Sequence, residues 1–88
     1  IHGLNQRTFF GLRNLNELYL SFNRISILEN FTFESLNNLD SLFIGKNELK
    51  LIETNALYDL TKLRTLDLHA NKLEVLNNDI FKNLNNIE

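Results

Sequence analysis

Asp67 and His69 are the one pair of side chains whose types and spacing suggest acid–base or metal chemistry. On an extended strand, residues i and i+2 project from the same face, so a carboxylate and an imidazole would lie side by side. A zinc site needs at least three protein ligands, and the sequence offers no obvious third one here. His2 shares no motif with His69. We therefore interpret the pair as a solvated surface feature rather than a metal or catalytic site.

Other catalytic and cofactor-binding motifs are missing from the chain. It has no cysteine nucleophile, no G-x-S-x-G elbow and no glycine-rich phosphate loop. The net charge is −2, and no basic cluster marks a nucleic-acid footprint. No apolar run approaches the roughly 20 residues that cross a bilayer. We expect no enzymatic activity, no cofactor, no metal, no nucleic-acid partner and no membrane contact within this segment.

Asparagine recurs at a fixed interval of 24 residues, at Asn23, Asn47 and Asn71. A side-chain amide carries two donor hydrogens and an acceptor oxygen, so it can satisfy backbone groups that a buried turn leaves unpaired. The recurrence predicts a ladder of buried asparagines that bridges successive turns of the chain.

The same interval organises the whole sequence. Lines of 24 residues begin at Leu15, Leu39 and Leu63, and apolar residues fill positions 1, 4, 6, 11, 14, 19 and 22 of each line. The chain thus divides into a partial repeat 1–14, complete repeats 15–38, 39–62 and 63–86, and residues 87–88 of another. Neither end resembles the polar or cysteine-bearing cap of a repeat array. We therefore expect residues 1–88 to be an internal segment of one longer repeat domain.

Positions 4 and 6 are apolar between polar or variable neighbours, which is typical of a short strand with one buried face. Such a strand is too short to be stable alone and must pair with the same strand of the next repeat, which gives a parallel sheet. The apolar positions 14, 19 and 22 then return the chain across the core, and the spacing of three suits a helical or 3-10 turn.

The segments LNELYLSFNRI, LDSLFIGKNEL and LRTLDLHANKL share the pattern LxxLxLxxNxL, which resembles the leucine-rich-repeat family. The 24-residue length, with Phe or Leu at position 19, is similar to the class found in Toll-like receptor ectodomains and secreted leucine-rich immune proteins. The resemblance implies an α/β solenoid, a right-handed superhelix with a parallel sheet on its concave face. Short helical, 3-10 or irregular segments would form the convex face.

The resemblance also implies that the concave face carries the ligand, so the outward residues of the strands and the turns after them are the candidates. They are Tyr19, Phe22, Phe43, Lys46, Arg64, Asp67 and His69. We expect the three aromatic rings to cluster on one exposed patch, with Gly45 leaving a gap for a partner. The alternative is that Tyr19 and Phe43 merely stabilise the sheet across neighbouring strands.

One N-glycosylation sequon, Asn30-Phe31-Thr32, falls on the return segment, away from the expected concave face. A glycan on Asn30 would leave that face free.

These features favour a non-catalytic protein-recognition scaffold in an extracellular protein. It would be secreted or part of a receptor ectodomain, with a role in innate immunity. The partner would be another protein, such as a receptor, a ligand or a pathogen-derived molecule. Two alternatives remain: an intracellular adaptor, and a structural spacer that touches no ligand. The sequence predicts no oligomeric state.

Overall fold

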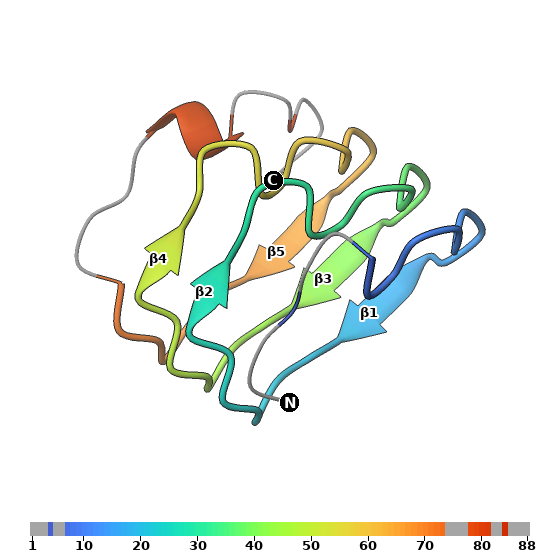
Figure 1. Ribbon diagram of the computed structural model, residues 1–88. Helices are drawn as coiled ribbons and strands as arrows, with labels where there is room; N and C mark the ends of the chain where they lie inside the picture. The colour runs from blue at the N-terminus through green and yellow to red at the C-terminus, as the bar shows by residue number, and fades with distance from the viewer. Residues whose placement is uncertain (1–3, 5–6, 74–77, 82–83, 85–88) are drawn as a thin grey trace.

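The computed structural model describes Leu4 and residues 7–73, 78–81 and 84, which wind through successive turns of a coil (Figure 1). Each turn contributes one short strand to a parallel sheet with the order β1-β3-β5. These strands are β1 (Glu17–Tyr19), β3 (Ser41–Phe43) and β5 (Thr65–Asp67). The predicted solenoid with a parallel sheet along one wall is therefore confirmed.

The strands pair at an offset that matches the sequence interval. Leu18 lies opposite Leu42, and Leu42 lies opposite Leu66. Parallel backbone hydrogen bonds continue beyond the strands: the Phe22 N–H donates to the Gly45 carbonyl at 3.2 Å, and the Lys46 N–H donates to the His69 carbonyl at 2.9 Å. Side chains from equivalent positions consequently stand in columns across the sheet.

A second, smaller parallel sheet forms on the opposite wall, and the sequence did not predict it. It pairs β2 (Ile27–Leu28) with β4 (Leu51–Ile52). Leu28 and Ile52 point inward and are buried, while Ile27 and Leu51 remain exposed. Two residues per strand give too short an alternation to be recognised as a strand in the sequence.

The return segments consist of tight turns whose N–H groups donate to carbonyls three residues earlier. In the first complete repeat, Glu34 bonds to Phe31 at 3.1 Å and Leu36 bonds to Phe33 at 3.1 Å. This is the 3-10 pattern, and in the last repeat it forms the helix η1 (Asn78–Phe81). Turns of this kind match the predicted convex side of short helical, 3-10 or irregular segments.

The two walls enclose an apolar core built from the repeated positions. Burial is complete in the middle of the stack, at Leu42, Ile44 and Leu49. The equivalent Leu18 and Leu66 are only partly buried. Because each turn is covered only by its neighbours, the stability of this core depends on stacking rather than on any single repeat.

The recurring asparagines hold the corner where each turn leaves the sheet. Asn47 is buried; its Oδ1 accepts from the Ile25 N–H at 3.0 Å, and its Nδ2 donates to the carbonyls of Leu20 at 2.9 Å and Ile44 at 3.0 Å. Asn71 repeats the arrangement one turn later, with its Oδ1 accepting from Leu49 at 3.0 Å. Asn23 donates to the Leu20 carbonyl at 3.0 Å. Each of the two later amides thus bonds both its own turn and the preceding one. Asn23 and Asn71 are only half-buried, so the expected burial of the ladder holds for Asn47 alone, the member covered by a turn on each side.

Replacing Asn47 with alanine is expected to lower the free energy of unfolding by about 1–3 kcal/mol, because buried backbone groups on two turns lose their partners. Urea denaturation of the purified chain measures the loss. Asn37→Ala is the matched control: Asn37 is exposed, so its loss should stay within about 0.5 kcal/mol. Equal stabilities for the two variants would contradict a structural role for the Asn47 amide.

Candidate functional site

The outer face of the β1-β3-β5 sheet carries an aromatic pair. Tyr19 and Phe43 occupy the same position in neighbouring strands, and their rings stack with centroids 4.8 Å apart and an interplanar angle of 6°. Tyr19 is 65% exposed, whereas Phe43 is half-buried between its neighbours. The Tyr19 hydroxyl donates to Glu17 Oε1 at 3.2 Å, and this hydrogen bond to a carboxylate raises the pKa of the Tyr19 phenol.

The third aromatic residue, Phe22, does not join this stack, so the expectation of one three-ring cluster is wrong. Among the described residues, no ring contact links Phe22 with Tyr19 or Phe43. Instead the Lys46 ammonium lies 4.8 Å from the centre of the Phe22 ring, a cation–π contact. Both residues follow their strands in the left-handed backbone region, with φ values of 62° and 56°. This backbone turn directs Phe22 away from the strand column.

The gap expected at Gly45 is also absent, because His69 fills it. Gly45 is buried, and a Cβ atom built there would lie 2.5 Å from both Cε1 and Nδ1 of the His69 ring. The two residues occupy equivalent positions in adjacent turns, so a side chain of one turn covers the space left by the glycine of the other. The surface at this point is therefore the His69 ring, and not bare backbone.

Asp67 fixes the orientation of that ring. Its Oδ1 accepts from the His69 backbone N–H at 3.0 Å and lies 2.5 Å from the His69 Nδ1. Since an ionised carboxylate only accepts hydrogen bonds, the imidazole carries a proton on Nδ1. The backbone N–H first, and the ring second, lower the pKa of the Asp67 carboxyl group. In the part of the chain that the structure describes, no group of three or more His, Cys, Asp and Glu residues could hold a metal ion.

A polar hollow of about 960 Å³ lies at the edge of the sheet where the chain enters the strands. Arg64 lies 3.8 Å from Asp40 here, as an exposed and therefore weak ion pair. The hollow also contains Lys62, whose Nζ donates to Asn38 Oδ1 at 3.0 Å. Lys62 and Asn38 were not predicted as site residues, although they lie 24 positions apart, each at the last position of its repeat. That shared position was the available signal.

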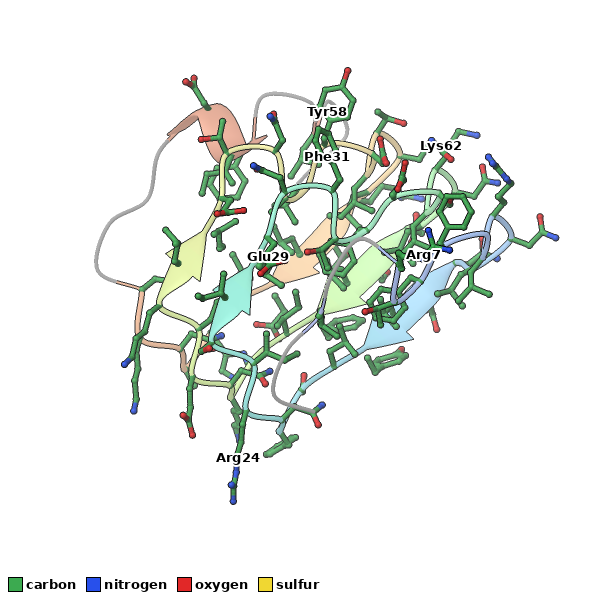
Figure 2. The ribbon with its side chains drawn as sticks, in the orientation of Figure 1. Arg7, Arg24, Glu29, Phe31, Tyr58 and Lys62 are labelled. Carbon is green, nitrogen blue, oxygen red and sulfur yellow. The ribbon has the colours of Figure 1, made fainter. Side chains whose placement is uncertain are left out.

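The sequon residue Asn30 lies apart from this face, on the return segment that follows β2. Figure 2 shows the neighbouring Phe31 at the opposite end of the molecule from Arg24, which follows Phe22 by two residues. The structure thus brings six of the seven candidates together as three contacting pairs on the sheet side: Tyr19 with Phe43, Phe22 with Lys46, and Asp67 with His69.

A Gly45→Ala substitution is expected to displace the His69 ring from Asp67, because the new methyl group would overlap the ring. The unfolding free energy should fall by about 1 kcal/mol, as for modest overpacking. NMR detects the movement as a changed His69 ring chemical shift. The double variant Gly45→Ala/His69→Ala should recover most of the lost stability. An unchanged His69 resonance in the single variant would contradict the packing described here.

Low pH should reveal the Asp67–His69 contact. The lowered pKa of Asp67 means that its ionised form stabilises the fold above the usual value of 3.8, and that this contribution is lost as the pH falls through the folded-state pKa. A carboxyl carbon NMR titration should place the midpoint of Asp67 below 3.8. His69→Ala removes the ring but keeps the backbone donor, so the midpoint should move only part of the way back. A midpoint at the usual value in the native chain would refute the contact.

Membrane-spanning helices are not found within the described residues.

Comparison with known proteins places the chain among repeat proteins. A family model described as leucine rich repeat matches residues 1–49 and residues 13–73. Comparison with curated proteins gives no match.

Among solved structures, the chain is similar to TLR13 in the crystal structure of the TLR13–ssRNA13 complex, with 36% sequence identity and a TM-score of 0.96. The match covers 99% of this chain and 12% of that chain. Together with the strand columns and the asparagine ladder, these matches show that the chain belongs to the leucine-rich-repeat family.

Proposed function

We propose that the chain is a non-catalytic recognition scaffold that binds another protein through the outer face of the β1-β3-β5 sheet, the concave face in its family. The observation that carries the proposal is Phe22. Its ring is 75% exposed, and its backbone is left-handed, a conformation that costs a residue with a Cβ atom about 1–2 kcal/mol. Lys46 and Ala70 have the same left-handed backbone at the equivalent position of their repeats, so this conformation belongs to the turn. The large exposed area of the Phe22 ring is what favours a contact role.

The stacked pair of Tyr19 and Phe43 adds less to this proposal. Parallel rings on neighbouring strands are the geometry of ordinary cross-strand packing, which by itself stabilises the sheet by a few tenths of a kcal/mol. The exposed part of the Tyr19 ring nevertheless leaves apolar area beside the Glu17 carboxylate, three residues before Phe22 in the chain. Apolar area ringed by charged groups is common in protein interfaces.

The similarity to TLR13 supports an extracellular or endosomal location, with the chain forming part of a receptor or secreted protein in innate immunity. Since the chain spans 12% of that receptor chain, the location and role of the whole protein are part of the proposal. An intracellular adaptor would use the same fold, and a structural spacer would use the repeats without any ligand contact.

Single-stranded RNA is the second candidate ligand, because the similar TLR13 structure is a complex with ssRNA13. The sequence analysis predicted no nucleic-acid partner, and this comparison weakens that expectation. The charges on the face favour a protein partner. The Lys46 ammonium lies over the Phe22 ring, and Arg64 lies beside Asp40, so both cations already have a contact within the chain. A phosphate backbone is normally bound by clustered cations.

The experiment places a photo-crosslinking residue at Tyr19 in the secreted protein, with the same residue at the exposed Leu51, on the β2-β4 sheet, as the positional control. A partner captured from position 19 alone is then measured for affinity against Phe22→Asn and Phe43→Ala. Asparagine tolerates the left-handed region, so Phe22→Asn keeps the fold while it removes the ring. We expect this variant to lose about 30-fold or more in affinity, which corresponds to the roughly 2 kcal/mol of a hot-spot residue.

Phe10→Ala, which removes an exposed ring elsewhere, should leave the affinity unchanged. Equal capture from both positions, or unchanged affinity for Phe22→Asn, would favour a spacer. Titration with a labelled single-stranded oligoribonucleotide tests the second candidate; binding that weakens steeply with added salt would identify RNA as the ligand.

A further inference from the structure

The sequon Asn30-Phe31-Thr32 is held in place by a single residue of the next turn, Asn55. The Asn55 N–H donates to the Asn30 Oδ1 at 2.9 Å. The Asn55 carbonyl accepts from the Phe31 N–H at 3.1 Å and from the Tyr58 N–H at 3.2 Å. The backbone of one residue, through its N–H and its carbonyl, therefore ties the Asn30 amide to the backbone of two aromatic residues.

This arrangement occupies the oxygen of the Asn30 amide and leaves its nitrogen toward solvent. Asn30 is exposed, and its backbone N–H donates to Glu53 Oε1 at 2.8 Å. Within the described residues, the Asn30 Nδ2 donates no hydrogen bond. A substituent on Nδ2 leaves Oδ1 free to accept, so the bond to Asn55 survives substitution.

Phe31 and Tyr58 lie together at one end of the molecule, as Figure 2 shows, and both their backbones are bonded to Asn55, the residue that also bonds the Asn30 amide. Their ring centroids are 5.7 Å apart at an interplanar angle of 77°, and the rings are 38% and 48% exposed. Phe31 also has a left-handed backbone, with φ of 59°, an outlier for a bulky residue. When two rings lie at right angles, the face of one of them can contact polarised C–H groups. The apolar side of a pyranose ring carries such C–H groups.

We propose that Asn30 carries an N-linked glycan whose first N-acetylglucosamine packs against Phe31 and Tyr58. The proposal rests on the extracellular placement proposed above, because the oligosaccharide donor is found in the secretory pathway. In the transfer, Nδ2 bonds to C1 of the sugar and loses one proton. The C1–O bond of a polyprenyl-diphosphate-linked oligosaccharide breaks, and the diphosphate leaves with the bonding electrons.

Thr32 sets the order of events. Its side chain is fully buried, and its hydroxyl donates to the Glu29 carbonyl at 2.7 Å. Because the hydroxyl of the sequon takes part in acceptor recognition, the transfer precedes closure of this turn. Once the turn has closed, the glycan stands on the return side and leaves the outer sheet face free.

The modification is tested by routing the full chain through the secretory pathway of eukaryotic cells with a fused signal peptide. The secreted chain is expected to be heavier than its sequence by the mass of a glycan, and an amide-cleaving glycosidase should remove that mass. Asn30→Asp keeps an oxygen for the Asn55 N–H but accepts no sugar, so it should fold and run at its sequence mass. Thr32→Ser keeps the sequon and should remain modified.

The packing is tested by NMR of the glycosylated chain. Sugar protons of the first N-acetylglucosamine are expected upfield of their positions in a glycosylated peptide of residues 28–34, because they lie over a ring. Tyr58→Leu should reduce the shift, while Phe10→Leu should not. A secreted native chain at its sequence mass overturns the site, and peptide-like sugar shifts overturn the packing. Neither result tests partner binding by Phe22, because the affinity for the partner can still be measured with unglycosylated protein.

Discussion

A side-chain amide at one corner of each turn, buried at Asn47 and half-buried at Asn23 and Asn71, is the interaction on which this molecule depends. At Asn47 the chain leaves the sheet and bends into the core, where water cannot satisfy its backbone. The amide accepts from Ile25 and donates to Leu20 and Ile44, so it joins two turns with one side chain. An aliphatic residue would leave these groups unpaired, and a charged one would be costly to bury. The strands are three residues long and could not align the turns alone.

Other corners of the coil are joined in the same way by polar side chains that lie one repeat apart. Lys62 bonds to Asn38, whose own Nδ2 donates to the Arg13 carbonyl at 2.8 Å. On the return side, Asn30 and Glu53 exchange bonds with the backbone of the neighbouring turn. Since these contacts fix the stacking from the corners, the outward residues of the sheet contribute little to holding the turns together. They are free to differ from turn to turn, as Tyr19, Phe43 and Asp67 do.

Two of the left-handed backbone positions of the coil carry exposed aromatic rings. Phe22 has this conformation after β1, and Phe31 has it after β2. Lys46 and Ala70 adopt the same conformation at the position of Phe22, so it is the exposure of the two rings that favours a use for them. The two rings serve different surfaces in our proposals. Phe22 faces a partner beside the sheet, and Phe31 supports a sugar on the return side.

The sequence by itself determined the period, the buried columns, the parallel sheet and the asparagine ladder. Each follows from apolar periodicity and from the hydrogen-bonding capacity of an amide, which are local properties repeated at a fixed interval. It also determined which residues face outward, because strand alternation does so. Only the tertiary structure decided what these side chains touch. The His69 ring packs over Gly45, and the Lys46 ammonium contacts the Phe22 ring. Asn55 hydrogen-bonds to the Asn30 side chain and to the backbone of two aromatic residues. In each case the partner comes from the neighbouring turn. Contacts between turns depend on rotamers and on left-handed φ values, and neither is encoded in a column of residue types.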